Sequence, residues 1–363
     1  MRIPLIKLWL RRAHLVMALV VGAFIICLSL TGALLIYAKD IQYLTQPQLW
    51  RVEPQFEPLG VEQIVTFVES TTAEKVSLFM PEQQPDLAWQ LKLSSGDYVS
   101  VNPYSGKILH RYEYYSTLYG FTMALHRWLL FEDADNKKPL RDWVSICALV
   151  LIIELVLGFY LWVKPKNRLK RLVIKPKAKL RILLYQLHTV LGVYLLLPIL
   201  LIAFSGMAFN WQPQTKAVVE WLSFDEVEAR PKPPTIAVNF HGLPYDLNSA
   251  TTRAKSTFPD SQLFRIYMPD KASDSIAYRV QNPGESHAYS WVWVNPYNSE
   301  VVAQYDASKA GVATQVWNFK YKFHIGDFAG PIVQFVWLML ALAPTLFTVS
   351  GLYFWLQRHR RRR

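Results

Sequence analysis

Two histidines occupy matching places in the sequence, each near the start of a long apolar segment. They are His14, in "AHLVMALVVGAF", and His188, in "LHTVLGVYLLLP". A polar imidazole at membrane depth is costly unless it has a partner, so such a residue indicates a functional site. Two neutral imidazoles from adjacent helices can hold a haem iron between them, and the small residues Ala18 and Gly192, one turn along, would leave room for a porphyrin. We predict haem ligation; the alternative is that both imidazoles only reach the lipid headgroups.

A second pair of histidines precedes the two other long apolar segments. His126 stands in "MALHRWLL" and His324 in "YKFHIGDF". Each ends a segment that is typical of a short interfacial helix, 116–130 and 307–323. We predict that these two residues are the axial ligands of a second haem iron, at the opposite leaflet from the first.

Four charged residues near these histidines have two interpretations each. Glu154 is the only charged residue inside the long apolar segments, and such a residue is usually protonated, paired or part of a pathway. It could relay a proton or tune a haem potential, or it could be a neutral acid that is hydrogen-bonded inside the bundle. Arg127, Lys320 and Lys322 could pair with haem propionates, or they could anchor the chain at the interface.

The remaining motifs argue against several other chemistries. The sequence has no Cys-x-x-Cys-His for covalent haem attachment, no His-Glu-x-x-His of zinc proteases and no glycine-rich nucleotide-binding loop. Cys27 and Cys147 both lie in apolar segments, so no disulfide is expected. The other histidines are expected to be surface, core or tail residues: His110, His241, His287 and His359.

The composition is typical of a membrane protein rather than of a nucleic-acid-binding protein. Apolar residues make up 52% of the chain and charged residues only 18%, against roughly 25% charged in an average soluble domain. Eighteen basic residues gather in three blocks that contain no acidic residue: before Ala13, within 164–181, and from Arg358 onward. Outside these blocks acidic residues outnumber basic ones, 27 to 21. This division indicates two compartments separated by a bilayer.

Four apolar segments are long enough to cross a bilayer, which takes about 20 residues. They are 13–37, 143–163, 182–211 and 331–356. The first exceeds the roughly 7–15 residues of a signal-peptide core, so we expect a retained span. Because basic residues favour the cytoplasmic side, the basic blocks and both termini are expected inside, and 38–142 and 212–330 outside. Pro198 and Pro344 are expected to kink their spans.

The sequence repeats itself, which predicts an internal duplication. The stretch from His14 to Gly32 aligns without gaps on the stretch from His188 to Gly206, at an offset of 174 residues. Further on, "VSVNPYSGKIL" resembles "VWVNPYNSEVV", and "GFYLW" resembles "GLYFW". From Asn102 to His126 is 24 residues, and from Asn295 to His324 is 29 residues. Matching the second histidine pair therefore requires an insertion of five residues. Both halves would enter the membrane in the same direction, as a parallel repeat.

Each outer region has the pattern of a small α+β module. An amphipathic helix, 61–70 or 247–256, is followed by three runs typical of strands. The Asn-Pro-Tyr turn folds the last run of each module into a hairpin. The predicted fold class is therefore a four-span helical bundle with two α+β modules, each with a helix and three antiparallel strands. The strand-like runs are 75–80, 87–93 and 98–109 in the first half, and 263–268, 276–281 and 290–302 in the second.

These features together resemble a known family. The module with its "VNPYSG" turn, flanked by spans with "LTG" and "GFYLW", resembles the PepSY-associated transmembrane family over nearly the whole chain. Within it, the chain resembles ferrioxamine-type siderophore reductases of the bacterial inner membrane. That resemblance implies four spans and two b-type haems per chain. It also implies a multi-pass protein of the inner membrane that reduces a ferric siderophore outside, releasing Fe(II). The electron donor stays open between a quinol in the bilayer and a cytoplasmic reductant.

Two other functions are compatible with parts of the sequence. A non-enzymatic, membrane-anchored PepSY binding or regulatory module would explain the outer modules, but it does not need four histidines in matching places. A haem or iron permease is a further alternative.

The predicted organisation under the reductase hypothesis is 1–37 (N-terminus and first span), 38–130 (first module with its interfacial helix), 131–163 (loop and second span), 164–181 (basic cytoplasmic loop), 182–211 (third span), 212–330 (second module with its interfacial helix) and 331–363 (fourth span and basic tail).

Overall fold

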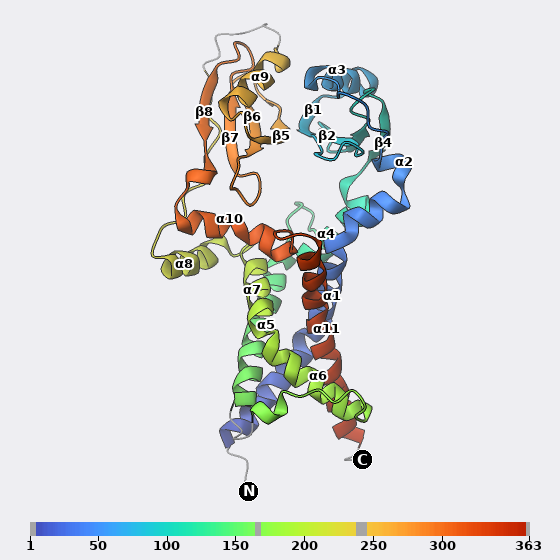
Figure 1. Cartoon of the computed structure of the whole chain (residues 1–363), viewed down its shortest axis with the longest axis vertical. Helices are drawn as coiled ribbons and strands as arrows, with labels where there is room; N and C mark the ends of the chain where they lie inside the picture. Colours follow the sequence, from blue (N-terminus) through green and yellow to red (C-terminus); the bar gives the residue numbers. More distant parts are fainter. Residues whose placement is uncertain (1–4, 164–167, 237–244, 361–363) are drawn as a thin grey trace. The chain divides into compact units, whose positions relative to one another are not determined.

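The computed structural model describes residues 5–163, 168–236 and 245–360 (Figure 1). His241 and parts of the three basic blocks lie outside the described residues. The chain forms two compact units, a helical one and one built around a sheet. The first contains residues 1–38, 121–218 and 320–363, and the second contains residues 39–120 and 219–319.

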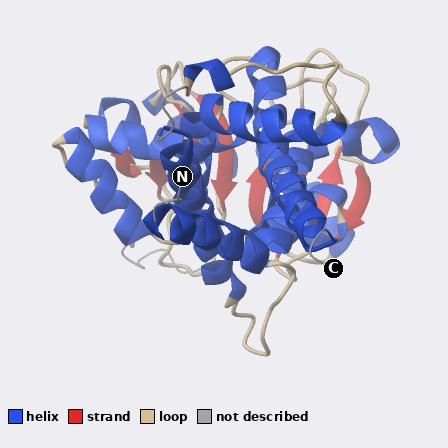
Figure 2. Cartoon of the chain, turned by 90° about the horizontal axis from the view of Figure 1, so that it is seen from below, coloured by secondary structure: helices blue, strands red, loops and turns tan. Residues whose placement is uncertain are grey.

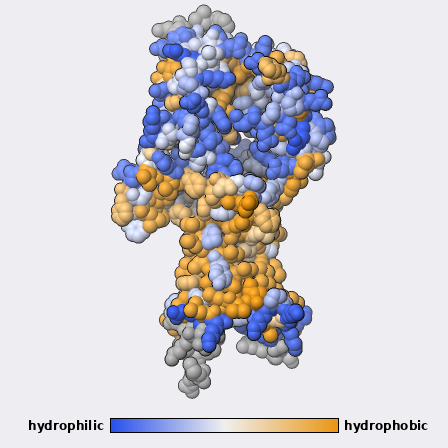
Figure 3. Space-filling view, viewed as in Figure 1, coloured by the Kyte–Doolittle hydropathy of each residue, from blue (hydrophilic) through white to orange (hydrophobic). Residues whose placement is uncertain are grey.

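Three of the described helices are long and apolar enough to cross a membrane. They are α1 (Leu5–Thr45), α5 (Leu140–Val163) and α11 (Pro331–Arg360). A fourth crossing is present if α6 (Leu180–Tyr194) and α7 (Leu196–Met207), which are bent by 68°, count as one span. The surface over these helices is largely apolar (Figure 3). The structure thus has three candidate spans, and four with the bent pair.

The third predicted span differs most from the expectation, because it is broken rather than kinked. The break lies at Leu195, between α6 and α7. Pro198 has no N–H to donate to the carbonyl of Tyr194, four residues earlier, and its ring crowds that carbonyl. The proline in α11 has no such effect on continuity, since that helix runs through Pro344.

Apolar contacts and hydroxyl groups hold the helices together. Val21 and Ile25 of α1 pack against Cys147 of α5, and Leu155 of α5 packs with residues of α7 and α11. Between α1 and α11, the hydroxyl of Thr345 donates to Ser29 Oγ at 2.8 Å. These contacts set α1, α5, α7 and α11 against one another in the helical unit.

The strands of the second unit form one continuous sheet in the order β4-β3-β2-β1-β5-β6-β7-β8. These strands are drawn in red in Figure 2. All the neighbouring pairs are antiparallel, and β1 pairs with β5, which joins the two halves of the chain. The prediction of three strands per module was wrong by one, because the Asn-Pro-Tyr turn divides the last run into two strands. The strands are β1 (Val76–Met80), β2 (Trp89–Leu93), β3 (Tyr98–Val101), β4 (Ile108–Tyr112), β5 (Gln262–Tyr267), β6 (Ile276–Gln281), β7 (Ser290–Val294) and β8 (Val301–Tyr305).

Two amphipathic helices cover one face of this sheet. They are α3 (Val61–Thr72) and α9 (Leu247–Thr257), close to the predicted bounds. Their apolar residues, such as Ile64 and Ala250, are fully buried against alternate strand residues, such as Phe79 and Ile266. The period-two alternation of the strands therefore directs one set of side chains into this core and the other set to the opposite face.

Short helices connect the two units along the chain. Of these, α4 and α10 carry the second histidine pair and correspond to the predicted interfacial helices. Only α4, α8 and α10 among the described short helices run from one unit into the other. The short helices are α2 (Pro47–Trp50), η1 (Tyr114–Ser116), α4 (Leu118–Trp128), η2 (Leu169–Arg171), α8 (Gln212–Ser223), η3 (Ala307–Lys309) and α10 (Val312–Ile325).

Candidate functional site

The first predicted pair of histidines faces across the helical unit. The ring centres of His14, on α1, and His188, on α6, lie 6.4 Å apart with 80° between the ring planes. A bond from an imidazole nitrogen to a metal is about 2.0–2.1 Å long, and the ring centre lies about 1.1 Å beyond that nitrogen. Two imidazoles that bind one metal atom from opposite sides therefore have ring centres about 6.3 Å apart. The observed spacing therefore fits one metal atom between the two rings.

The second predicted pair has the same spacing. The ring centres of His126, on α4, and His324, on α10, lie 6.3 Å apart with 52° between the ring planes. Burial, and after it the neighbouring His324 and Arg127, lowers the pKa of His126 to about 3. Burial likewise lowers the pKa of His324 to about 4. Both imidazoles are therefore neutral at physiological pH, which is the form that binds a metal.

The hydrogen bonds of the second pair define which ring nitrogen carries the proton. Nδ1 of His126 lies 3.0 Å from Thr31 Oγ1, and Nδ1 of His324 lies 3.0 Å from Ser205 Oγ. Each hydroxyl donates its own hydrogen to a carbonyl of its helix, that of Cys27 at 2.7 Å and that of Ile202 at 2.9 Å. The hydroxyl oxygens must then accept from Nδ1–H, so the lone pair is on Nε2.

In the first pair, Nδ1 of each histidine also lies close to an oxygen atom, but the partner residues differ. Nδ1 of His188 lies 2.7 Å from Ser350 Oγ, and that hydroxyl donates to the carbonyl of Leu346 at 2.7 Å. Nδ1 of His14 contacts the carboxylate of Glu154, which is only 7% exposed. His188, His126 and His324 are therefore held as the Nδ1–H tautomer, which presents Nε2 to a metal.

Two glycines make room for the second pair of rings. A Cβ atom added at Gly32 would lie 3.1 Å from Cε1 of His126, and one at Gly206 would lie 3.1 Å from Cε1 of His324. A distance this short is tighter than ordinary van der Waals contact, so the helices approach the rings more closely than an alanine would allow. Each glycine directly follows the hydroxyl residue that binds the same ring, Thr31 or Ser205.

The two halves differ at one position of the first site. The repeat that aligns Gly158 with Gly351 also aligns Glu154 with Phe347. Glu154 contacts His14, whereas the ring of Phe347 lies 5.5 Å from the ring of His188. A carboxylate thus stands beside one imidazole and a phenyl ring beside the other, so the environments of the two ligands are unequal.

The other predicted residues have a range of surroundings. Lys322 forms an ion pair with Asp327. Burial, followed by the charge of Lys216, lowers the pKa of Lys320 to about 8. Three of the remaining histidines make aromatic contacts, His110 with Tyr112 at 5.5 Å, His287 with Phe264 at 4.6 Å and His359 with Trp355 at 4.9 Å.

These sites suit a metal that brings most of its own ligands. Among the described residues, no group of three or more His, Cys, Asp or Glu side chains could hold a metal ion. A bare ion in either histidine pair would therefore have two protein ligands, fewer than the four of a structural zinc site. Haem iron needs only the two axial ligands from the protein, so the residues present fit haem.

The hydroxyl partners Thr31, Ser205 and Ser350 were not predicted from the sequence. A signal for two of them exists, because a hydroxyl residue followed by glycine recurs at the repeat offset of 174, at Thr31 and at Ser205. Ser350 has no comparable signal, since its counterpart in the alignment of the two halves is Leu157. Glu154 was predicted as a candidate because it is the only charged residue of the long apolar segments.

The fold and the sites define a membrane-spanning helical protein with a histidine-bearing bundle and a sheet-containing unit. The chain belongs to the PepSY-associated transmembrane family: the family model described as the PepSY-associated TM region matches residues 11–358. No curated protein sequence matches the chain.

Proposed function

We propose that this protein is a haem-containing reductase of the bacterial inner membrane, which moves electrons across the membrane to a ferric siderophore. One observation carries the proposal: four buried or half-buried histidines form two facing pairs at 6.3–6.4 Å, and each Nδ1 meets an oxygen atom from another helix. Packing alone does not require the Nδ1–H tautomer that hydrogen bonds give to three of these histidines. A site that must present Nε2 to iron does.

The separation of the two sites suits transfer across a bilayer. His14 and Gly32, which touches the second site, are 18 positions apart on the continuous helix α1. At about 1.5 Å per residue this is ~27 Å along the axis, close to the roughly 30 Å of a hydrocarbon core. One site would lie at each leaflet. The proposed internal duplication accounts for the repeated histidine, hydroxyl and glycine positions.

Haem bound at these sites would supply one-electron, outer-sphere transfer, because two histidine ligands leave iron no open position. The chain's own residues hold the ligands in place: hydroxyl groups orient His126, His188 and His324, and Glu154 contacts His14. For the acceptor, reduction of Fe(III) to Fe(II) weakens binding by hard oxygen ligands and releases the iron.

The distribution of charge supports the orientation of the proposed pathway. The start of α1, the segment that leads into α6 and the end of α11 lie at one end of the helical unit (Figure 1). These three places carry basic residues and no acidic ones. We place this end in the cytoplasm, where a quinol or a soluble reductant would donate to the His14/His188 site.

Haem content of single variants tests the proposal. His14→Ala or His188→Ala should remove one of two haems per chain, and His126→Ala or His324→Ala should remove the other, as measured by pyridine haemochrome assay and low-spin visible spectra. His359→Ala, which removes an imidazole packed on Trp355, is the control and should keep both. Full haem content in all four ligand variants, or a haem-free wild type, would contradict the assignment.

A further inference from the structure

The sheet has a second face, opposite to the one covered by α3 and α9, on which cations and aromatic rings alternate. In the second half of the sheet, Arg265 of β5 pairs in register with Arg279 of β6, and Arg279 pairs with Trp291 of β7. Tyr267 lies on the same face, with its ring 5.6 Å from that of Trp291. The two arginines and Tyr267 are partly exposed. The row is therefore accessible to a ligand.

The two arginines are placed at a cost to the fold. Like charges directly opposite each other on neighbouring strands are destabilising. Nε of Arg279 donates to the carbonyl of Ala288 at 2.6 Å, and Nε of Arg265 is buried without a hydrogen-bond acceptor among the described residues. Neither forms an ion pair within the described chain. Burial, and the charge of Arg265, lowers the pKa of Arg279.

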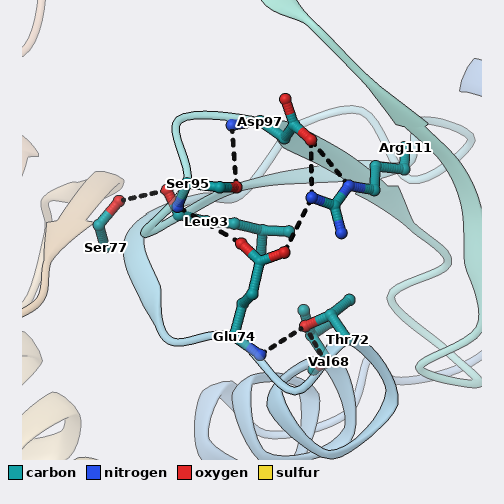
Figure 4. Close-up of polar contacts among 8 residues, drawn as sticks. All are labelled: Val68, Thr72, Glu74, Ser77, Leu93, Ser95, Asp97 and Arg111. Carbon is teal, nitrogen blue, oxygen red and sulfur yellow. Dashed lines mark hydrogen bonds and ion pairs between the residues drawn. The ribbon is translucent and has the colours of Figure 1, made fainter.

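An arginine in the first half of the same sheet, Arg111, is paired with acidic side chains (Figure 4). Nε and Nη2 of Arg111, on β4, donate to Asp97 at 2.8 and 2.7 Å, and Nη2 lies 2.8 Å from Glu74. The carboxylates neutralise this guanidinium. Among the described residues, acids pair with the arginine at one place on the sheet, whereas no ion pair compensates the charges of Arg265 and Arg279 at another, which favours an anion from outside.

Aromatic rings surround the uncompensated charges. Cζ of Arg279 lies 5.8 Å from the ring centre of Trp291, and Cζ of Arg230 lies 5.5 Å from the same ring. The first half repeats the arrangement more weakly, with Nζ of Lys92 at 5.9 Å from the ring centre of Tyr98. Tyr98 is close enough to Arg265 and Tyr267 to interact electrostatically with them. Such rings can stack on the aromatic groups of a ligand while the arginines bind its negative charge.

We propose that the face formed by Arg265, Arg279, Tyr267 and Tyr98 binds an anionic ligand that carries aromatic rings, of the class of catecholate metal chelates. Charge complementarity selects this occupant over a cationic or neutral hydroxamate chelate, and the aromatic rings select it over a simple anion. The choice of a metal chelate rests on the proposed reductase function. The binding itself does not depend on electron transfer.

A redox-inert probe separates binding from reduction. The full-length protein in detergent is titrated by calorimetry with the gallium(III) complex of a linear tris-catecholate, and with that of a cationic trishydroxamate. The wild type should bind the anionic complex and prefer it over the cationic one. Arg265→Gln or Arg279→Gln should raise the Kd for the anionic complex about 10- to 100-fold, as expected for the loss of a charged hydrogen bond.

Arg111→Gln is the matched control, because it removes an arginine that is already neutralised on the same sheet. It should leave the Kd unchanged, and Arg265→Lys should retain much of the affinity. Unchanged binding in both glutamine variants, or a preference for the cationic complex, would overturn the proposal. A protein that binds the gallium complex in this way but never reduces a ferric chelate would keep this site and contradict the reductase function instead.

Discussion

At the scale of single residues, each proposed iron ligand is oriented by an oxygen atom from a different helix. Thr31 of α1 serves His126, Ser205 of α7 serves His324, and Ser350 of α11 serves His188. Each hydroxyl hydrogen is already donated to a carbonyl of its own helix. A serine or threonine that only bonds back to its helix is common; here the same group also determines the histidine tautomer.

Removal of one such hydroxyl should weaken haem binding at one site only. Thr31→Val keeps the side-chain shape but leaves Nδ1–H of His126 without its acceptor, so haem affinity at the second site should fall about 10- to 100-fold. Thr189→Val is the control, because Thr189 donates to the carbonyl of Tyr185 at 2.8 Å and touches no histidine in this way. Haem transfer to apomyoglobin measures the affinity. An equal loss in both variants would show that the hydroxyl acts on the helix rather than on the ligand.

Glu154 should lower the reduction potential of the first haem. A carboxylate that accepts from Nδ1–H makes the imidazole a stronger donor and favours Fe(III). Glu154→Gln should therefore raise the midpoint potential of the haem held by His14 and His188 by tens of millivolts, where ~59 mV is a tenfold change in a one-electron equilibrium. The potential of the other haem should stay constant in the same redox titration. A downward shift, or an equal shift of both haems, would exclude this role.

At the scale of elements, α10 positions His324 and is secured at its start by two aspartates. Asp225 accepts from the backbone N–H of Ala313 at 3.0 Å, in the first turn of α10. Asp306 accepts from Asn282 Nδ2 at 2.8 Å and from the backbone N–H of Ser308 at 3.1 Å, which ties η3 to the end of β6. These bonds stabilise η3 and the first turn of α10.

The cap at Asp306 should make local stability depend on pH. Burial raises the pKa of the Asp306 carboxyl. Hydrogen bonds from Ser308 and Asn282 and the contact with Lys309 outweigh this effect and lower the pKa to about 2. The unfolded carboxyl, with a pKa of about 3.9, takes up its proton first, so the stabilisation is present above about pH 4 and is lost as the pH falls towards 2.

Hydrogen exchange of amides 307–313 can measure this effect. Asp306→Ala should cost about 1 kcal/mol of local stability at pH 7, which lowers protection about fivefold. The difference in amide protection between the variant and the wild type should shrink as the pH falls from about 4 to about 2. A difference that stays constant over that range would mean that packing, and not the carboxylate, stabilises this turn.

At the scale of the whole molecule, the proposed electron transfer requires the two histidine pairs to act in series. Their separation of about 27 Å along α1 leaves each close to one side of a bilayer. Neither site alone spans it. Electron delivery from one side to the other therefore requires both, whatever acceptor is used.

Sealed vesicles with a reductant inside test this dependence. His14→Ala should stop the turnover of an external ferric chelate, which is measured by capture of Fe(II) with a chelator. The remaining haem of this variant should still pass on an electron after it has been reduced by dithionite from outside. Turnover of His14→Ala at the wild-type rate would mean that electrons enter from the outer side.

The orientation of the C-terminus has a separate test. A reporter that is active only in the periplasm, fused after Arg363, should be inactive.

Local patterns in the amino-acid sequence were enough to predict the elements of this protein and the residue types of its candidate sites. Apolar runs of membrane length, period-two strands and Asn-Pro-Tyr turns are local patterns, and they identified the long helices, the modules and the family. The repeat offset also predicted the pairing of His14 with His188. That these residues hold haem stays a prediction.

Only the tertiary structure decided how distant parts of the chain meet. The pairing of β1 with β5, the hydroxyl partner of each histidine, and the juxtaposition of Arg265 with Arg279 all join residues whose neighbours in sequence say nothing about the contact. The break at Leu195 likewise depends on how the bundle accepts Pro198, since Pro344 lies inside a continuous helix. Hydrophobic periodicity reports which face of an element is buried, but the partner on that face is selected by packing, by hydrogen-bond satisfaction and by charge in three dimensions.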